Sequence, residues 1–279
     1  MIRFDGRVAV VTGAGRGLGA AYARALADRG AALVVHDAGV GRDGEGDDPS
    51  VADAVVTEIR GAGGTAVASH ENLGSEAGCA RVIATAVDEF GRLDVLVNNA
   101  GLVLYQPIEE AVHSWERLRR VNVDAPFHLS RAAFPLMKRQ RYGRIVFTTS
   151  GIAMSGEDTR PGLAAYAAGK MAQFGLMVVF AAEGAEHGIR ANAISPVAAT
   201  RIYTREVRPG ELEPEQVAPG VVYLASEACD ANGVVLGAAG GLFAPRRWWR
   251  DPGVDFGKAL VTPEQIQERW AEISGGEGD

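Results

Sequence analysis

The fold is indicated by the stretch VAVVTGAGRGLG at residues 8–19. Its first five residues have the apolar, β-branched composition of a buried strand, and the glycine-rich run leads into a helix expected over 19–29. Glycines permit a tight turn and a close backbone approach, so the N-terminus of that helix can face a pyrophosphate. A glycine-rich turn can also be purely structural, so its interpretation depends on the rest of the chain.

Strand and helix patterns alternate along the remaining sequence. We expect further strands at 32–37, 65–69, 95–98, 144–149, 190–194 and 233–240. We expect further helices at 51–62, 75–90, 114–139 and 163–187. Nearly continuous apolar strands that alternate with helices are typical of a parallel sheet covered on both faces. The sequence therefore predicts an α/β fold in one domain: a doubly wound, Rossmann-type parallel sheet of about seven strands with helices on both faces.

The length of 279 residues suits one large α/β domain and is short for two. We assign residues 1–244 to this domain. Residues 245–279 form a polar, tryptophan-containing tail, and its Gly-Gly-Glu-Gly-Asp end is expected to be disordered. The segment 39–49 is rich in glycine and aspartate and is expected to be a surface loop.

Composition limits the classes of partner. A net charge of −7 argues against nucleic acid or an anionic membrane as the main partner. The N-terminus shows no signal-peptide pattern, and no apolar run reaches transmembrane length without a charge or a glycine-rich break, so we expect a cytoplasmic protein. Cys79 and Cys229 lack metal-ligand spacing and are expected to be small buried side chains. The histidines form no ligand cluster, so we expect no metal.

Asp37 ends the second expected strand, about twenty residues beyond the glycine run. A carboxylate there can accept hydrogen bonds from an adenosine ribose, and it would repel a 2′-phosphate, which favours NAD over NADP. Arg16, in the glycine run, argues for NADP because it could attract that phosphate. Asp37 could also be a turn residue at a strand end. We expect NAD because a carboxylate at the ribose excludes the phosphate directly, whereas an arginine there can be solvated.

Tyr166 and Lys170 are four residues apart in the helix expected over 163–187, so their side chains share one face. An ammonium beside a phenol favours the phenolate and lowers a pKa that is ordinarily about 10. Lys170 is one of only three lysines among 28 basic residues, which favours a need for a compact ammonium at this position. The same spacing occurs by chance in many helices, so its meaning depends on the other motifs.

Five motifs in order along nearly the whole chain carry a resemblance. The glycine run, Asn98-Asn99-Ala100-Gly101, Asn122, Ser150 and the Tyr166/Lys170 pair together resemble the short-chain dehydrogenase/reductase family. Within it, the chain looks most similar to the (3R)-hydroxyacyl-CoA dehydrogenase domains of peroxisomal multifunctional enzymes and their bacterial relatives. That similarity rests on FDGRV at 4–8, YGRIV at 142–146, VAP at 217–219 and TPE at 262–264.

The resemblance implies four catalytic residues. Tyr166 would exchange a proton with the substrate oxygen, and Lys170 would lower the pKa of Tyr166 and hold the nicotinamide ribose. Ser150 would hydrogen-bond the substrate oxygen and stabilise developing charge. Asn122, within the long helix, would hold a water that relays protons to Lys170. The structural alternatives are a strand-end turn for Ser150 and a helix-surface amide for Asn122.

The resemblance also implies the cofactor contacts. They are Gly13, Arg16, Gly17, Leu18, Gly19, Asp37, Asn72, Leu73, Asn99, Ala100, Gly101, Tyr166, Lys170, Pro196, Val197 and Thr200. Asn98 is expected to stabilise the neighbouring strands. Val197 replaces the glycine usual after this proline, which makes backbone contacts there less certain, while Thr200 is the expected partner of the nicotinamide carboxamide.

Three segments bear on the substrate. The interval between Ser150 and Tyr166 is about three residues longer than in the family, and the extra length at 156–162 either forms a surface loop or reshapes the pocket mouth. The segment 201–216 would be a lid, and its Arg201, Arg205 and Arg208 either meet an anionic substrate or are solvated. The run RRWWR at 246–250 either stacks on an adenine, closes a neighbouring subunit's pocket, or docks the tail on its own domain or a partner.

The expected function is that of an NAD-dependent oxidoreductase acting on a secondary alcohol or ketone, with a 3-hydroxyacyl-CoA or a hydroxysteroid as the leading small-molecule substrates. One alternative is a ketoreductase of a specialised bacterial pathway. Another is an NAD-binding protein that has lost turnover. Family members pair through the helices expected at 114–139 and 163–187, which implies a homodimer or homotetramer.

Overall fold

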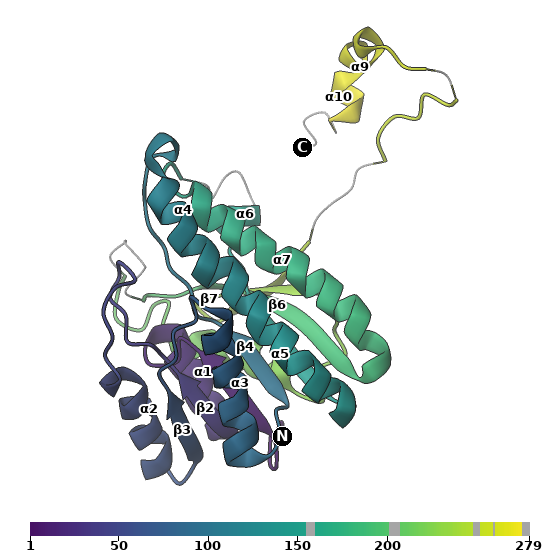
Figure 1. Cartoon of the computed structure of the whole chain (residues 1–279). Coiled ribbons are helices and arrows are strands. Elements are labelled where there is room, and N and C mark those ends of the chain that lie inside the picture. Colours follow the sequence, from purple (N-terminus) through teal and green to yellow (C-terminus); the bar gives the residue numbers. More distant parts are fainter. Residues whose placement is uncertain (155–159, 201–206, 248–251, 259, 275–279) are drawn as a thin grey trace. The chain divides into compact units, whose positions relative to one another are not determined.

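The computed structural model describes residues 1–154, 160–200, 207–247, 252–258 and 260–274 (Figure 1). Its strands are β1 (Val8–Thr12), β2 (Ala32–His36), β3 (Thr65–Ser69), β4 (Val95–Asn98), β5 (Gly143–Thr148), β6 (Ile189–Val197), β7 (Val235–Ala239) and β8 (Leu242–Arg246). Its α-helices are α1 (Gly17–Ala27), α2 (Ser50–Gly61), α3 (Glu76–Phe90), α4 (Val112–Arg119), α5 (Ala125–Gln140), α6 (Gly151–Met154), α7 (Ala164–Gly184), α8 (Ala218–Ala225), α9 (Pro263–Glu268) and α10 (Trp270–Ile273).

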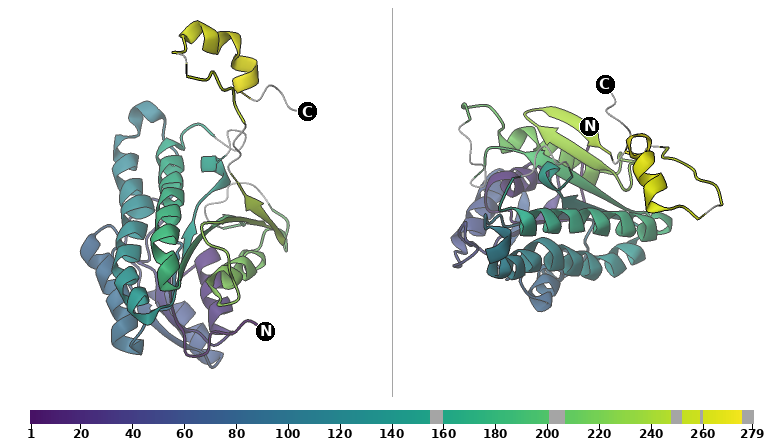
Figure 2. Two further views of the ribbon diagram at one scale, coloured as in Figure 1. Left: turned by 90° about the vertical axis from the view of Figure 1, so that its right-hand side faces the viewer. Right: turned by 90° about the horizontal axis from the view of Figure 1, so that it is seen from above.

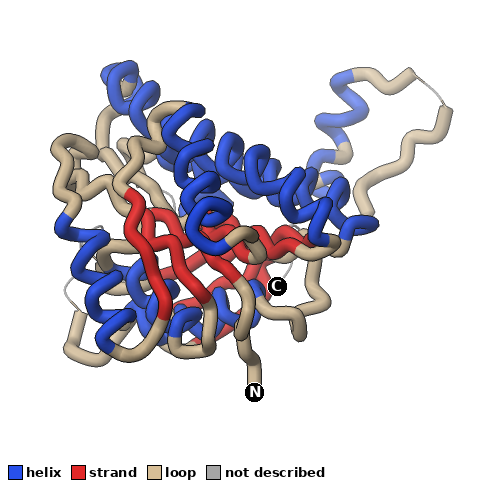
Figure 3. The backbone as a smooth tube through the Cα atoms, turned by 60° about the horizontal axis from the view of Figure 1, so that its bottom comes forward, coloured by secondary structure: helices blue, strands red, loops and turns tan. Residues whose placement is uncertain are grey.

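All eight strands form one sheet in the order β3-β2-β1-β4-β5-β6-β7-β8, which Figure 3 shows between the helices. Pairs from β3 to β7 are parallel, and β8 runs antiparallel to β7. The predicted doubly wound α/β fold is confirmed. The eighth strand was not predicted, since it begins after a reversal at Gly240 and Gly241, both with positive φ, and all its residues are exposed.

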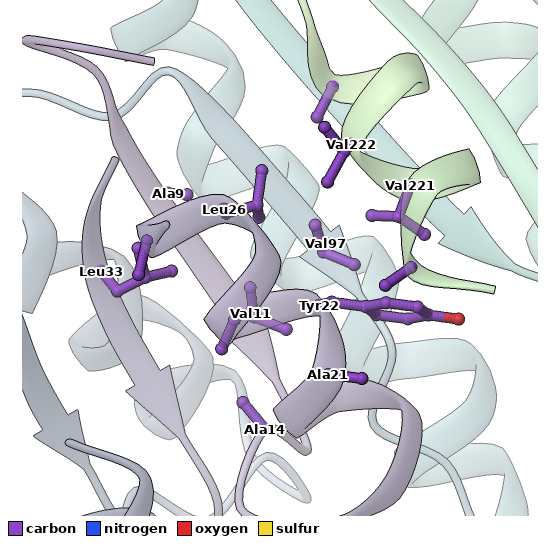
Figure 4. Close-up of a cluster of buried hydrophobic side chains, with 14 of the residues drawn as sticks. Ala9, Val11, Ala14, Ala21, Tyr22, Leu26, Leu33, Val97, Val221 and Val222 are labelled. Carbon is purple, nitrogen blue, oxygen red and sulfur yellow. The ribbon is translucent and has the colours of Figure 1, made fainter. Parts of the chain in front are cut away.

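Two apolar layers hold the helices to the sheet. The helices α1, α2 and α8 pack on one face, and α3, α5 and α7 pack on the other, with α5 and α7 side by side (Figures 1 and 2). Figure 4 shows the first layer, where Val11 and Val97 of the sheet meet Tyr22 and Leu26 of α1 and Val221 of α8. Successive connections leave β1 and β4 toward opposite faces, so a crevice opens at the carboxyl ends of these neighbouring strands.

The helix expected at 114–139 is interrupted. It consists of α4, a π-helical turn at Arg120–Asp124, and α5. Pro126 has no N–H, so the α-helical bond to the carbonyl four residues earlier, that of Asn122, cannot form. The π turn accommodates this loss and buries Asn122 completely.

Helix α7 is long and apolar enough to cross a membrane by length and composition alone. It packs against β5 and β6, and it buries two polar side chains, those of Lys170 and Gln173. A helix that covers a sheet meets the same two criteria.

Residues from Arg247 onward form a second compact unit, separate from Met1–Arg246. Its described part contains α9 and α10, and Thr262 and Gln265 form a capping box at the start of α9. None of the residues in these two helices is buried. The end at 275–279, which we expected to be disordered, lies outside the described residues. The assignment of a domain at 1–244 with a tail stays a prediction.

A buried carboxylate joins strands at the amino ends of the sheet. Asp94, just before β4, accepts hydrogen bonds from the Val8 N–H at 2.9 Å, from Arg7 at 2.9 Å and from Arg92 at 2.7 Å. The carboxylate is fully buried, while both arginines keep some solvent exposure. Four charge-assisted bonds, two of them from Arg92, therefore compensate its desolvation.

Replacing Asp94→Ala should lower the free energy of unfolding by about 3 kcal/mol, because it leaves the Val8 N–H and a partly buried guanidinium unpaired. Urea denaturation measures this loss. Asp5→Ala removes an exposed ion pair with Arg3 and should change the same quantity by less than about 0.5 kcal/mol. Equal losses in the two variants would contradict a structural role for Asp94.

Candidate active site

A cleft of about 780 Å³ lies over the carboxyl ends of the strands. It is lined by every residue predicted to contact the cofactor: Gly13, Arg16, Gly17, Leu18, Gly19, Asp37, Asn72, Leu73, Asn99, Ala100, Gly101, Tyr166, Lys170, Pro196, Val197 and Thr200. Ser150 also lines it. Of the predicted site residues, Asn122 is the one that does not line the cleft. Such a volume suits a ligand of cofactor size together with a second small molecule.

The glycine run packs too closely against its neighbours to carry side chains. A Cβ on Gly13 would lie 2.9 Å from Ala100 Cα, and one on Gly19 would lie 2.1 Å from Gly13 O. The Asn99 amide reinforces this contact by donating to Thr12 O at 2.8 Å and to Gly13 O at 3.1 Å. The turn between β1 and α1 is thus bound to the segment after β4.

The start of α1 is open toward an anion. Gly17 has φ +52°, a conformation that favours glycine, and a Cβ there would lie 3.2 Å from Thr200 Cγ2. The side chain of the N-cap residue Arg16 makes no capping hydrogen bond, and the first turn holds no acidic residue. The backbone N–H groups of this turn and the positive end of the helix dipole face the cleft, which fits the pyrophosphate of a dinucleotide.

Asp37 follows β2 and has a structural function as well as a place in the cleft. Its Oδ2 accepts from the Gly15 N–H at 3.0 Å, and its Oδ1 accepts from the Gly39 N–H at 2.8 Å. Each carboxylate oxygen has a second lone pair. The turn interpretation and the ribose interpretation of Asp37 are therefore compatible.

The segment 39–49 is a wall of the cleft, whereas we expected only a surface loop. The Arg117 guanidinium of α4 donates to Asp43 O at 2.7 Å and pairs with the Glu45 carboxylate. Gly44 approaches so closely that a Cβ would lie 2.7 Å from Leu102 Cδ1, and Gly44 itself lines the cleft. The sequence did not show this contact because Arg117 lies 74 residues beyond Asp43 in the chain.

Ser150 follows β5, and its hydroxyl is hydrogen-bonded to the Tyr166 phenol. Burial raises the pKa of Tyr166 above its ordinary value of 10, and the bond from Ser150 opposes that rise. The Lys170 ammonium lies 5.9 Å from the centre of the phenol ring. The expected direction of the pKa shift was therefore wrong for this structure, because the desolvation of Tyr166 outweighs the groups that favour its phenolate.

Lys170 holds a buried ammonium. Its side chain is 4% exposed, and Nζ donates to Thr148 O at 2.9 Å. Burial lowers the pKa of Lys170 to about 8. Gly101 leaves the ammonium its space, since a Cβ there would lie 3.1 Å from Nζ.

Asn122 is fully buried, so the alternative of a helix-surface amide is wrong. Its Oδ1 accepts from the Leu102 N–H at 3.0 Å, and its Nδ2 donates to Leu102 O at 2.9 Å. This pair of bonds holds the chain after β4 against the π turn. The role of Asn122 in holding a water stays a prediction.

The substrate side of the cleft is described in part. Val197 and Thr200 lie there as expected, and Arg208 is exposed and outside the lining of the cleft. Residues 155–159, 201–206 and 248–250 lie outside the described residues. Most of the expected pocket loop, the first six residues of the lid with Arg201 and Arg205, and Trp248 and Trp249 of the tail therefore have no structural test.

Arg160 and Arg246 line the cleft, and they belong to the segments 156–162 and 246–250 that we singled out from the sequence. Tyr105, Ile152 and Leu163 also line the cleft and were not predicted. Thr148 and Gln173 were missed as well, although a glutamine one turn after Lys170 in an otherwise apolar helix was a visible signal.

The chain matches the short chain dehydrogenase family over residues 7–211. It is 41% identical over 279 residues to peroxisomal multifunctional enzyme type 2 from Mus musculus, an alignment that covers 98% of this chain and 37% of that enzyme. The chain thus spans little more than a third of this relative. The solved structure of a short chain dehydrogenase from Mycobacterium avium has a TM-score of 0.85 at 36% identity, covering 99% of this chain and 97% of that one.

Two further solved relatives contain nicotinamide cofactors. A metagenomic short-chain oxidoreductase in complex with NADP has a TM-score of 0.69 at 33% identity, covering 82% of this chain and 95% of that one. A 7α-hydroxysteroid dehydrogenase complexed with NADH and 7-oxo glycochenodeoxycholic acid has a TM-score of 0.76 at 31% identity, covering 86% and 95%.

Because burial lowers the pKa of Lys170, the free energy of unfolding should depend on pH through the proton of this ammonium. Between pH 8 and 10.5 the unfolded lysine keeps a proton that folded Lys170 has released, so folding becomes more favourable as the pH rises. The unfolding free energy of the native chain should therefore rise relative to that of Lys170→Met, by about 3 kcal/mol across this window. Urea denaturation at fixed pH values measures the difference.

Lys138→Met is the matched control, because Lys138 is exposed and should show no such pH-dependent difference. A constant difference between the native chain and Lys170→Met would contradict a lowered pKa at Lys170.

Proposed function

The chain belongs to the short-chain dehydrogenase/reductase family and is an oxidoreductase that acts on alcohol groups, and we propose that it transfers a hydride between NAD and a secondary alcohol or ketone. One observation carries the proposal. Ser150, Tyr166 and Lys170 line a single cleft together with a glycine cradle and an uncapped helix N-terminus. This arrangement supports a proton-transfer group beside a dinucleotide site.

The residues of the cleft fit a dinucleotide. The N–H groups at the start of α1 would hold its pyrophosphate, and Asp37 would hold the adenosine ribose. Asn72, Leu73 and the loop that contains Gly44 would enclose the adenine end. When bound, the dinucleotide supplies or accepts the hydride.

Tyr166 is the group that handles the proton. Its raised pKa keeps the phenol protonated at neutral pH, so it can donate its O–H to a substrate oxygen during ketone reduction. Alcohol oxidation needs the phenolate as acceptor, so its rate should increase with pH. Ser150 is placed to donate a hydrogen bond to the same substrate oxygen.

Lys170 supports Tyr166 electrostatically. With a pKa of about 8, the Lys170 side chain carries a positive charge at neutral pH. That charge lies 5.9 Å from the phenol ring and stabilises the anion that forms when Tyr166 loses its proton.

We propose NAD as the cofactor because the adenosine end of the cleft is acidic. Asp37 and Asp47 line this end, and Asp43 lies in the loop that forms its wall. This negative potential would repel a 2′-phosphate, whereas a free 2′-hydroxyl can donate a hydrogen bond to the Asp37 carboxylate. Arg16, which is exposed, is the one basic residue of the glycine run.

The proposed substrate is bulky and largely apolar, of the 3-hydroxyacyl-CoA or hydroxysteroid type. The sequence similarity to a peroxisomal multifunctional enzyme supports the first class, and the similarity to a 7α-hydroxysteroid dehydrogenase supports the second. A ketoreductase of a specialised bacterial pathway would use the same proton-transfer residues on another ketone. A protein without turnover is less well supported, because all four catalytic residues are present.

We also propose a homodimer or homotetramer in the cytoplasm. Apolar side chains that a monomer leaves exposed, namely Phe127 of α5 and Val178 and Val179 of α7, support pairing through these helices. A small-molecule substrate remains the only partner proposed besides a second copy of the chain.

Tyr166→Phe should lower kcat/KM for alcohol oxidation by about 10²–10⁴-fold, because it removes the hydroxyl that accepts the proton. The dissociation constant for NAD should change little. NAD reduction with a panel of secondary alcohols measures the first quantity, and calorimetry measures the second. Tyr223→Phe, at an exposed tyrosine of α8, is the control. Equal rates for Tyr166→Phe and the native enzyme would refute the assignment.

The native chain should bind NAD at least about tenfold more tightly than NADP. Asp37→Asn should remove most of this preference, because a neutral amide no longer repels the 2′-phosphate. Titration of both dinucleotides, with the exposed Asp28→Asn as control, measures the ratio. Tighter binding of NADP by the native chain would overturn the choice of cofactor.

A further inference from the structure

Thr148, the last residue of β5, has no strand partner on one side. Strand β4 ends at Asn98, which pairs with Phe147. The next amide along β5, that of Thr149, bonds to Ile194 O on the other neighbour, β6. Since successive residues of a strand point their backbone groups to opposite sides, the N–H and C=O of Thr148 face the place where β4 has already ended.

Side chains of α7 replace the missing strand. The Lys170 Nζ donates to Thr148 O at 2.9 Å, and Gln173 Oε1 accepts from the Thr148 N–H at 3.2 Å. Lys170 and Gln173 are three residues apart and so lie on the same face of the helix. One helix face therefore satisfies both backbone groups of one residue.

Gln173 makes a second bond on its other side. Its Nε2 donates to Asn122 O at 3.0 Å. This carbonyl is available because Pro126 has no N–H with which to continue the helix. Gln173 thus joins the π turn, which holds Leu102, to the strand end that holds Lys170.

The bridge is specific for a glutamine. Gln173 is 1% exposed, and its carbonyl faces a donor while its amino group faces an acceptor. The separation that it spans is set by backbone packing, since Gly169 lies so close to the π turn that a Cβ would be 2.8 Å from Asn122 Cβ. Methionine would fill the space without either bond. Glutamate would place a carboxylate oxygen opposite Asn122 O, where both are acceptors, and would put a negative charge one turn from Lys170.

We propose that Gln173 is a positioning residue for proton transfer: it fixes the Thr148 carbonyl that holds the Lys170 ammonium and orients the Asn122 carbonyl beside it. The inference rests on the proposed function, and it adds to it a residue outside the four that the family resemblance supplies. Gln173 acts through Lys170 and Tyr166 and does not itself line the cleft.

The test compares Gln173→Met and Gln173→Glu with Ser130→Ala. Ser130 is a buried residue of α5 that accepts a hydrogen bond from Asn98, so its loss removes a buried bond away from Lys170. Gln173→Met should lower kcat for alcohol oxidation by about tenfold or more, with the KM for NAD changed less than about twofold, because misplaced catalytic groups lose rate more than binding. Ser130→Ala should keep the native kcat.

The pH dependence separates positioning from mere stability. A carboxylate beside the ammonium should raise the pKa of Lys170, so Gln173→Glu should shift the pH profile of kcat to higher pH and weaken the rise in unfolding free energy between pH 8 and 10.5. The pH profile of kcat in Gln173→Met should also differ from that of the native enzyme. Native kcat and native pH profiles in both Gln173 variants, with stability losses equal to that of Ser130→Ala, would overturn the proposal.

The two hypotheses fail in different ways. The proton linkage of unfolding needs neither cofactor nor substrate. An unaltered linkage in Gln173→Glu therefore refutes the bridge whatever the enzyme's activity. If Gln173→Glu alters the linkage while the native protein oxidises no alcohol, the proposed function is refuted and the bridge is retained.

Discussion

The hydrogen bond from the Lys170 ammonium to Thr148 O is the contact on which the site depends. An ammonium on a side chain that is 4% exposed and donates to the Thr148 carbonyl is costly to bury, and the lowered pKa of Lys170 reflects that cost. The fold tolerates it because β4 stops one residue short of Thr148, which leaves a carbonyl for the ammonium. The same geometry sets the Lys170 ammonium 5.9 Å from the centre of the Tyr166 ring, where in the proposed mechanism its positive charge would assist proton transfer.

The rest of the crevice is built by close backbone contacts. Gly13 and Gly19 allow the first turn to touch the segment after β4, and Asn99 binds the two together. The π turn buries Asn122, whose amide holds the backbone of Leu102. Hydrogen bonds thus join the glycine run to the segment after β4, and that segment to the π turn that contains Asn122. A displacement of the glycine run would therefore be transmitted to the π turn.

The sequence predicts the site better than it predicts the connections within it. Tyr166 and Lys170 share a helix face by spacing alone, and the glycine run lies between a strand and a helix as its pattern requires. The π turn was missed although Pro126, which cannot continue an α-helix, was a visible signal within the helix expected at 114–139. The contact of Arg117 with the loop at 39–49 and the bridge of Gln173 both join segments far apart in the chain, which local patterns do not reveal. The direction of the Tyr166 pKa shift depends on desolvation, a property of the folded packing.

In the proposed reaction, Tyr166 moves a proton while a hydride passes between a carbinol carbon and the nicotinamide. A secondary alcohol deuterated at its carbinol carbon, incubated with NAD and the native enzyme, tests this through the mass of the reduced dinucleotide. We expect a reduced dinucleotide that carries the deuterium, with formation that becomes faster as the pH rises. Reduced dinucleotide without deuterium, or labelled dinucleotide formed at the same rate at every pH, would contradict it.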